Sequence, residues 1–395
     1  MTTAGVIAEF NPFHNGHRHL LSAARNAADG VVVVLGSNFT QRGEPALYDK
    51  RYRAAAALLN GADLVLELPI AFSLSAAPTF ALGGVQVLSA LGTVDTLVFG
   101  SECGDLTRLS AAANAVEDQR VQTALHTLLQ TGLPFPAARE SAVRQVFGDG
   151  IADVLQAPND ILGVEYLRAA HSLSAPFRWV PVSRVGNAHD AKEYNGNFAS
   201  ATLLREKIRA GEAVSDFMPQ NAYDILQNAI VNRAAPSDYR KLETAILCFL
   251  RMASPADFAG VPDVSEGIEN RILAAAKTAQ TLWAVFDTAK TKRYTHARIR
   301  RVVLSAFLGL TTDLQKNGVP YLRVLGFNEH GKALLRAARD TARLPIVMRA
   351  GDISKCTPTA QSMFGLECKA TDIFNMTLPE IRECGSEMTD NVVRI

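Results

Sequence analysis

The sequence has few of the features that mark membrane proteins, secreted proteins or cysteine-liganded metal proteins. Its 395 residues include only five cysteines, at positions 103, 248, 356, 368 and 384, and none forms a C-x-x-C pair. This scattered, odd-numbered set argues against a disulfide framework or a cysteine zinc site. No apolar run approaches the roughly 18 residues that cross a membrane, and the N-terminus lacks the pattern of a signal peptide. We therefore expect a cytoplasmic protein with reduced thiols and no membrane partner.

An excess of charge of either sign is also missing. The formal net charge is +1, so no global field attracts nucleic acid, and an RNA-binding surface would need a local basic patch. Hydrophobic residues make up 48% of the chain and charged residues 20%, which is typical of a globular protein. The length is sufficient for two or three domains.

The first hundred residues alternate between strand and helix patterns. We predict strands at 6–10, 30–39, 62–69 and 94–102, and helices at 17–29, 49–61 and 78–92. The second strand is apolar over most of its length, which indicates burial on both of its faces. Such alternation predicts βαβ units, and therefore an α/β fold with a Rossmann-like, doubly wound parallel sheet.

The remainder of the chain is mostly helical in pattern. Residues from about 104 to 157 read as a helical insertion, after which a helix at 158–170 and a fifth strand at 177–185 resume the sheet pattern. We divide the chain into a first domain, 1–215, and a mainly helical domain, 216–395. Two short strand-like pieces, PYLRVLGF and LPIVMRA, interrupt the second domain.

The segment that joins the first strand to the first helix is the strongest candidate site. It places His14 and His17 three residues apart, on the same side of a helical turn, with Gly16 between them. Ligands bind at the carboxyl ends of strands in such sheets, and a helix start offers free N–H groups to a phosphate. The glycine would let the backbone approach closely, and the imidazoles could meet charge that develops on an α-phosphate. A structural histidine pair and half of a metal site are the alternatives.

The turn after the second strand, GSNFTQRGEPALYDKRYR, is rich in polar residues. Its charged side chains could reach a charged ligand: Arg42, Glu44, Lys50 and Arg53. The alternative is a solvated loop in which Asp49 caps the following helix.

Three weaker features lie at other expected carboxyl ends of strands. Ser200 and Thr202 open a helix with Arg205 one turn later, which forms either a second anion-binding device or a simple N-cap. Asn159 or Asp160 could cap its own helix or contact a base or ribose. Gly100 follows the fourth strand and is weak evidence by itself.

A basic segment near residue 295 contains no acidic residue. It contains Tyr294, His296 and six cations: Lys290, Lys292, Arg293, Arg298, Arg300 and Arg301. On a nearly neutral protein this asymmetry indicates a surface for a nucleic-acid phosphate backbone. An exposed basic helix face is the alternative.

Two of these motifs together resemble the HIGH-type nucleotidyltransferase superfamily. That superfamily pairs an H-x-G-H turn after the first strand with an S-S-T-x-x-R-like helix start after the fifth. His14-Asn15-Gly16-His17 fits the first motif, and Ser200-Ala201-Thr202 with Arg205 fits the second. Ala201 departs from the pattern, so one hydroxyl contact is missing.

A longer resemblance is to bacterial tRNA(Met) cytidine acetate ligase. It runs from about residue 5 to at least residue 310 and rests on seven segments in order: AEFNPFHNGH, NFTQRGEPALYDK, NGADLVLELP, FGSE, PNDILGVEYL, SRVGNAHD and KRYTHARIRR. The resemblance implies a nucleotidyltransferase-type catalytic domain in 1–215 and a tRNA-binding role for 216–395. It implies that ATP and acetate form acetyl-adenylate, which then acetylates N4 of the wobble cytidine of elongator tRNA(Met).

The resemblance also implies functional residues. The ATP site would comprise Ile7, Ala8, Glu9, Phe10, Asn11, Pro12, Phe13, His14, Asn15, Gly16, His17, Arg18, His19, Leu20, Gly100, Asn159 and Arg184. His14 and His17 would be catalytic, Ile7 and Phe13 would pack near the nucleoside, and Ser200, Thr202 and Arg205 would hold the β- and γ-phosphates. The six cations of the basic segment would contact the tRNA backbone, and Tyr294 would stack on a base. Mg²⁺ suits this chemistry, but no carboxylate cluster marks its site and we assign no metal ligand.

Two other functions fit part of the pattern. An adenylyltransferase of coenzyme biosynthesis would share the phosphate site, but it would not need the basic segment. A non-catalytic RNA-binding protein could retain a degenerate nucleotide site, but the H-x-G-H motif is intact.

Overall fold

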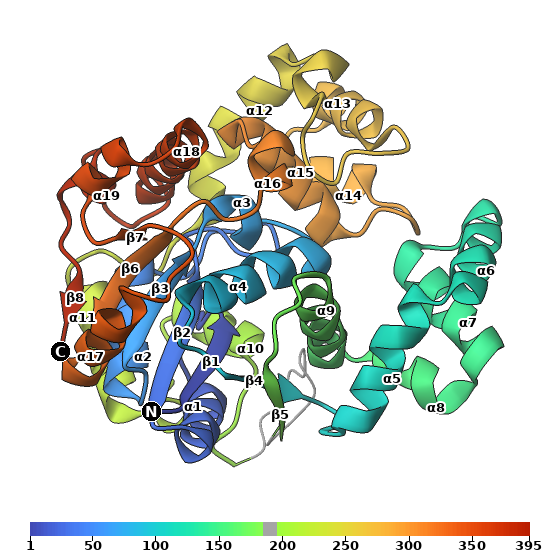
Figure 1. Ribbon diagram of the computed structural model, residues 1–395. Coiled ribbons are helices and arrows are strands. Elements are labelled where there is room, and N and C mark those ends of the chain that lie inside the picture. Colours follow the sequence, from blue (N-terminus) through green and yellow to red (C-terminus); the bar gives the residue numbers. More distant parts are fainter. Residues whose placement is uncertain (185–195) are drawn as a thin grey trace.

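Five parallel strands form the centre of the computed structural model, which describes residues 1–184 and 196–395 (Figure 1). In the order β5-β4-β1-β2-β3 they comprise Arg178–Ser183, Thr96–Ser101, Thr3–Ala8, Gly30–Gly36 and Leu64–Leu68. The chain moves from β1 outward to β3 and then crosses to β4 on the other side of β1. The predicted doubly wound parallel sheet is therefore confirmed.

Helices cover both faces of this sheet. The side chains of β2 alternate between them, so Val31 and Val33 pack in one core cluster while Val32 and Val34 pack in the other. One face is covered by α1 (Asn15–Ala27) and α2 (Lys50–Leu59), and the other by α3 (Ile70–Ser73), α4 (Ala77–Leu91) and α9 (Pro158–Ser172). All seven residues of β2 are buried, as its apolar sequence predicts.

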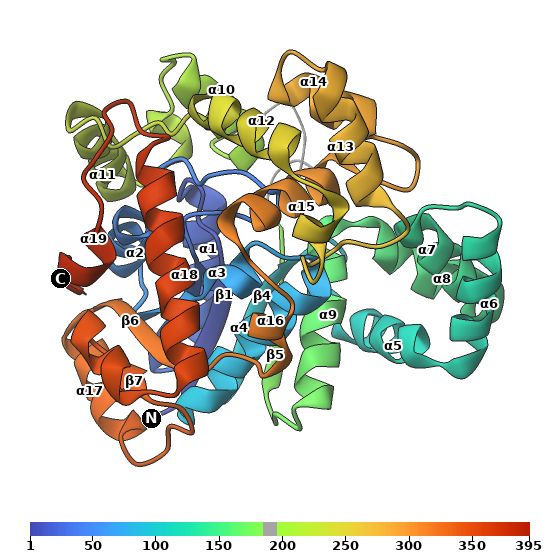
Figure 2. The same cartoon turned by 90° about the horizontal axis from the view of Figure 1, so that it is seen from above.

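The residues between β4 and α9 form only helices. They are α5 (Leu106–Glu117), α6 (Gln119–Gln130), α7 (Phe135–Phe147), α8 (Asp149–Ala152) and the 3-10 turn Asp153–Gln156. This group stands together at one side of the molecule in both perpendicular views (Figures 1 and 2).

The following part of the chain is also mostly helical. Its α-helices are α10 (Ala201–Arg209), α11 (Gln220–Val231), α12 (Glu243–Met252), α13 (Ile268–Thr278), α14 (Leu282–Ala289), α15 (His296–Leu308) and α16 (Asp313–Lys316). Short 3-10 turns occur at Ser215–Phe217, Tyr239–Leu242 and Pro255–Phe258. Among the described residues, no helix is both long enough and apolar enough to cross a membrane.

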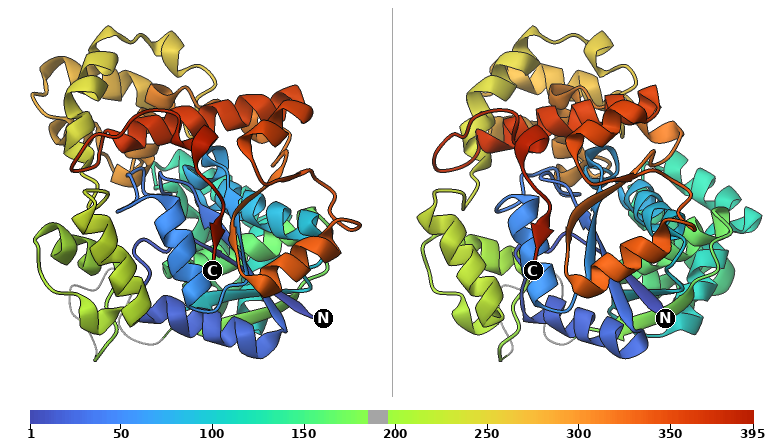
Figure 3. Two further views of the ribbon diagram at one scale, coloured as in Figure 1. Left: turned by 90° about the vertical axis from the view of Figure 1, so that its left-hand side faces the viewer. Right: turned by 60° about the vertical axis from the view of Figure 1, so that its left-hand side comes forward.

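The last eighty residues return to the sheet. Strand β6 (Leu322–Phe327) pairs antiparallel with β3, and β7 (Ile346–Val347) and β8 (Val393–Arg394) pair with β6. The other elements are α17 (Glu329–Ala338), the 3-10 turn Ala350–Lys355, α18 (Pro358–Asn375) and α19 (Ser386–Thr389). Figure 3 shows α18 above the sheet, with the terminal strand descending beside it. The sheet thus contains strands from both sides of residue 215, and the division into two domains there stays a prediction.

A buried ion cluster fastens this C-terminal segment to the sheet. Lys50 pairs with Glu67 and lies 2.7 Å from both Glu367 and Glu387, while Arg323 lies 3.1 Å from Glu67 and 2.5 Å from Glu387. Burial raises the pKa of Glu367 to about 7. Burial also acts on Glu387, but the nearby cations led by Lys50 hold its pKa below the usual range. Oppositely charged partners are what make such burial tolerable.

Candidate active site

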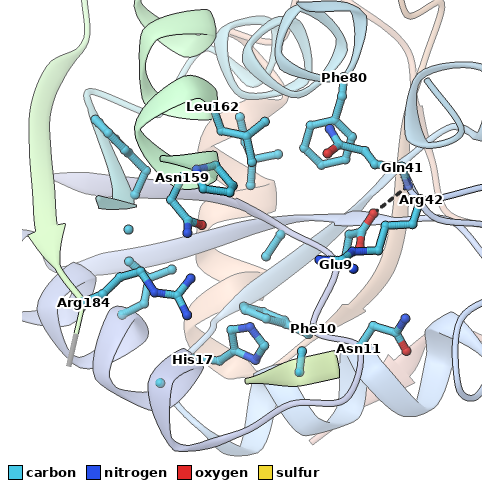
Figure 4. Close-up of a pocket in the computed structure, with 18 of the residues that line it drawn as sticks. Glu9, Phe10, Asn11, His17, Gln41, Arg42, Phe80, Asn159, Leu162 and Arg184 are labelled. Atoms are coloured by element: carbon cyan, nitrogen blue, oxygen red, sulfur yellow. Dashed lines mark hydrogen bonds between the residues drawn. The ribbon is translucent and has the colours of Figure 1, made fainter. Parts of the chain in front are cut away.

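A cavity of about 610 Å³ lies at the carboxyl ends of β1, β4 and β5. The order of the strands reverses between β1 and β4, and this is where doubly wound sheets bind ligands. Figure 4 shows the cavity with Phe10 and His17 near its base. Two groups of side chains line opposite parts of it. The β5 side comprises Phe99, Gly100, Asn159, Val182 and Arg184, and the β2 side comprises Gln41, Arg42, Phe80, Ala297 and Arg301.

Hydrogen bonds from two arginine side chains fix the backbone of the turn after β1. Arg53 donates from Nη1 to the carbonyl oxygen of Glu9 at 2.7 Å, and Arg205 donates to that of Asn11 at 2.9 Å. Phe10 has a φ of 47°, an unusual conformation for a residue other than glycine. Strained backbone of this kind clusters at functional sites, where the surrounding contacts maintain it.

His14 and His17 form a stacked pair at the start of α1. The Nδ1 atom of His14 accepts a hydrogen bond from the Gly16 N–H at 3.0 Å, and Nδ1 of His17 accepts from the His14 N–H at 3.3 Å. The ring centroids are 3.6 Å apart. A neutral imidazole that accepts at Nδ1 carries its proton on Nε2. The contacts therefore assign both rings the tautomer that donates from Nε2.

Gly16 is needed at this turn because of the His14 ring. A Cβ at this position would lie 2.9 Å from Cε1 of His14 and 3.1 Å from its Nδ1, closer than side-chain contacts normally allow. The glycine lines the cavity as well, so it can still let a ligand approach the backbone. The sequence analysis expected only the second reason.

The start of α10 faces the same cavity, to which Thr202 and Arg205 contribute. Ser200 is the N-cap, and its side chain accepts a hydrogen bond from the Leu203 N–H. Arg205 Nη2 donates to the Thr202 hydroxyl at 3.1 Å. Burial lowers the pKa of Arg205 to about 10, with the nearby Arg42 contributing, and the guanidinium stays charged at neutral pH. The predicted N-cap at Ser200 is therefore confirmed, while the anion-binding role of Thr202 and Arg205 stays a prediction.

Asn159 projects from the first turn of α9 into the β5 side. Its Nδ2 donates to the Glu102 carboxylate at 2.6 Å. Neither Asn159 nor Asp160 caps the helix, so that alternative is wrong; Ala157 occupies the N-cap position without a side-chain bond. Asp160 is buried and accepts from the Glu102 N–H at 2.9 Å, which shapes the turn after β4.

Fifteen of the residues predicted for ATP line the cavity: Ile7, Ala8, Glu9, Phe10, Asn11, His14, Gly16, His17, His19, Leu20, Gly100, Asn159, Arg184, Thr202 and Arg205. Pro12, Phe13, Asn15, Arg18 and Ser200 are not in the lining. Phe13, expected near the nucleoside, is fully buried and packs against Phe10 with ring centroids 4.9 Å apart. Asn15 instead joins α1 to the carbonyl groups of Asn197 and Asp216. Residues 185–190 of the SRVGNAHD motif lie outside the described residues.

The turn after β2 separates into two parts. Arg42 lines the cavity, and Glu44 pairs with Arg300. Lys50 and Arg53 do not reach a ligand, as the first interpretation of this turn required, because both side chains are fully buried within the protein. Asp49 caps α2 as the alternative predicted, accepting from the Arg51 N–H.

The basic segment is only partly available to an external partner. Lys290, Lys292 and Arg293 are exposed. The other three arginines contact the protein: Arg298 donates to the Asp263 carbonyl, Arg300 pairs with Glu44, and Arg301 lies 2.7 Å from Asp263. The hypothesis that Tyr294 stacks on a base is wrong for this structure, because the ring is 6% exposed and its hydroxyl donates to the Glu266 carbonyl at 2.7 Å.

Several lining residues were missed by sequence analysis. Phe80, Leu162 and Tyr166 stand on α4 and α9, where their apolar spacing matched ordinary core residues. Gln41 lay in a segment that was noted, but its uncharged side chain gave no signal. Within residues 1–184 and 196–395, no three His, Cys, Asp or Glu side chains are grouped so that they could hold a metal ion.

The fold and the cavity define a nucleotide-binding α/β protein of the HIGH nucleotidyltransferase class, and comparison with known proteins agrees. The family model described as HIGH Nucleotidyl Transferase matches residues 1–388. The tRNA(Met) cytidine acetate ligase of Acetivibrio thermocellus is 34% identical over 413 residues, covering the full length of both chains. That of Caldanaerobacter subterraneus subsp. tengcongensis is 37% identical over 385 residues, covering 95% of each.

Solved structures extend the match to the whole fold. The crystal structure of apo Thermotoga maritima TmcAL is 33% identical, covers all of both chains and gives a TM-score of 0.96. The structure of that protein bound with alpha-thio ATP gives a TM-score of 0.94, again over all of both chains. The chain belongs to the tRNA(Met) cytidine acetate ligase family of the HIGH nucleotidyltransferases.

Proposed function

We propose that this protein activates acetate with ATP in the cavity and then acetylates N4 of the wobble cytidine of elongator tRNA(Met). The observation that carries the proposal is the His14–His17 pair, facing a cavity in a chain that matches tRNA(Met) cytidine acetate ligases along its whole length. The same fold binds an ATP analogue in the Thermotoga maritima protein. The protein works in the cytoplasm, where ATP, acetate and tRNA are present.

In the first step an acetate oxygen attacks the α-phosphorus of ATP, and the bond to pyrophosphate breaks. Acetate is ionised at neutral pH, so no general base is required. Negative charge grows on the α-phosphate oxygens, where Nε2–H donors of His14 and His17 would stabilise it. The N–H groups at the start of α1 favour the same charge.

With the α-phosphate at the two histidines, the other parts of ATP can be placed in the cavity. Thr202, Arg205 and the start of α10, which Ser200 caps, hold the β- and γ-phosphates. The β5 side, with Gly100, Asn159 and Arg184, receives the adenosine. Glu9 is the only acidic residue in the described lining, so these residues do not form a magnesium site. Mg²⁺ would arrive on the phosphates themselves, and no step here depends on a protein-held metal.

In the second step the cytidine amine attacks the acetyl carbonyl carbon, and AMP leaves. The tRNA backbone contacts the exposed cations Lys290, Lys292 and Arg293. Arg293 lies next to the helical group α5–α8, because its Nη2 is 3.4 Å from the place of a Cβ at Gly132. The three arginines of α15 have other roles, because Arg298, Arg300 and Arg301 are engaged in protein contacts.

The test is incubation of the protein with labelled acetate, ATP and a tRNA pool, followed by nucleoside analysis. We expect label in N4-acetylcytidine from tRNA(Met), and acetate-dependent ATP–pyrophosphate exchange without tRNA. Exchange without any tRNA product or tRNA binding would favour a small-molecule adenylyltransferase. Binding of tRNA without pyrophosphate release would favour a non-catalytic RNA-binding protein.

A further inference from the structure

One carboxylate stands in a cavity otherwise suited to anions. Glu9 follows β1 directly and is the only Asp or Glu that lines the cavity among the described residues. Its side chain is half-buried. A carboxylate repels a triphosphate, so its presence needs a different explanation from that of the histidines and Arg205.

The contacts of Glu9 hold one oxygen and leave the other available. Oε1 accepts a hydrogen bond from the Gln41 N–H at 2.8 Å, as Figure 4 shows. Within residues 1–184 and 196–395, Oε2 accepts no hydrogen bond. The carboxylate interacts electrostatically with Arg53 of α2, Arg205 of α10 and Tyr166 of α9. Arg42 also lies beside it in Figure 4. Among the residues that the structure describes, the carboxylate is therefore oriented by one donor, and its second oxygen is left for another.

Glu9 lies on the side of the cavity where we expect the cytidine that accepts the acetyl group, and not on the side of the adenosine. Its partner Gln41 belongs to the β2 side of the cavity, opposite Asn159 and Arg184. The β2 side also includes Ala297 and Arg301 of α15, the helix that follows the exposed cations of the basic segment. Through Arg301, the helix that carries part of the basic segment therefore borders the cavity on the side of Glu9. A base that enters on this side would meet Glu9, the one carboxylate that the described part of the chain contributes to the lining.

We propose that Glu9 is a catalytic residue of the second step, accepting a hydrogen bond from cytidine N4 and then its proton. A carboxylate is the acceptor that matches the cytosine amine. The nitrogen forms its bond to the acetyl carbon, the carbon–oxygen bond to AMP breaks, and the N4 proton passes to Glu9 Oε2. Water later takes the proton, so no other reactant is needed. This inference rests on the proposed acetyl transfer to tRNA.

The decisive variant is Glu9→Gln, which keeps the size of the side chain and can still accept from Gln41. A general base contributes about 10²–10⁴-fold, so acetyl transfer to tRNA should fall at least about 100-fold further than acetate-dependent ATP–pyrophosphate exchange does in the same variant. Glu9→Asp restores a carboxylate at a shorter reach and should transfer faster than Glu9→Gln. Glu44→Gln is the matched control, because Glu44 is nearby but does not line the cavity. Both of its rates should stay near those of the unaltered protein.

Two other outcomes would overturn the role of Glu9 as the proton acceptor, and a third would overturn the proposed function. Transfer that survives Glu9→Gln would place the proton on the AMP phosphate or on water. Exchange and transfer that fall together, and recover with added Mg²⁺, would make Glu9 a metal ligand of the first step. If the unaltered protein shows exchange but no transfer to tRNA, the proposed function fails instead, independently of Glu9.

Discussion

The cavity and the buried ion cluster are two charged regions that draw on the same turn after β2. In the cluster, Lys50 and its partners are at most 8% exposed, and opposite charges stand within about 3 Å of one another. In the cavity, Arg42 and Glu9 remain partly exposed, and Glu9 keeps one oxygen without a donor in the described chain. The comparison shows that two cations eight positions apart, Arg42 and Lys50, can lie in different environments, one lining a cavity and the other enclosed in an ion cluster.

The two regions differ because a segment distant in the sequence encloses one of them. Lys50 is enclosed because Arg323, Glu367 and Glu387 return to the sheet from the C-terminal segment. No equivalent segment covers Glu9 within the described residues, where α15 only borders the cavity. The comparison predicts that changes in the cluster alter unfolding more than activity, and that changes in the cavity do the reverse.

The largest expected effect is on stability, from Lys50→Met. The substitution leaves Glu67, Glu367 and Glu387 with one cation fewer in a dry environment, which typically costs about 3–5 kcal/mol. We expect the free energy of unfolding, measured in urea, to fall by that amount. The folded fraction should retain acetate-dependent ATP–pyrophosphate exchange. Lys316→Met removes an exposed cation paired with Asp313 and should change stability by less than about 1 kcal/mol. Equal shifts for the two variants would mean that the cluster is not a special source of stability.

The next effect is on chemistry, from His17→Ala. Loss of one donor to developing charge typically costs about 10²–10³ in rate, and we expect this fall in ATP–pyrophosphate exchange. The variant also loses the hydrogen bond from the His14 N–H to Nδ1 of His17, so the free energy of unfolding should fall by only about 1 kcal/mol. His330→Ala, on the exposed face of α17, is the control and should leave exchange unchanged. Full exchange in His17→Ala would remove the histidine pair from the mechanism.

Gly16→Ala tests why a glycine stands between the histidines. The new methyl group would overlap the His14 ring, and overpacking of this kind costs about 1–3 kcal/mol. We expect the ring to move off His17 and exchange to fall, measured together with thermal unfolding. Gly365→Ala is the matched control, since nothing lies within 4 Å of that position in α18 and alanine favours a helix. If exchange is normal in Gly16→Ala, stacking of the two rings is not needed for catalysis.

The sheet and the histidine turn could be predicted because their signals are local. Residues 30–36 are apolar throughout and β2 is buried throughout, while His14 and His17 stand three residues apart on one helix. The role of Tyr294 could not be predicted, because its burial depends on Glu266, 28 positions earlier. Phe80 and Tyr166 were missed because an apolar side chain on a helix looks the same whether it faces the core or a cavity. Charge alone also did not show that Arg42 would line the cavity while Lys50 would be buried.

The smallest expected effect separates exposed from enclosed residues within the basic segment. The double substitution Lys292→Ala and Arg293→Ala removes two exposed cations, so tRNA binding should weaken and the slope of log affinity against log salt should flatten by about 1.5. Acetate-dependent exchange, which needs no tRNA, should be retained. Tyr294→Phe is the neighbouring control: it loses the buried bond to Glu266, worth about 0.5–1.5 kcal/mol of stability, yet should bind tRNA normally. Weaker tRNA binding in Tyr294→Phe, with the double variant normal, would mean that the segment opens to contact RNA. The enclosed side chains, and not the exposed cations, would then belong to the interface.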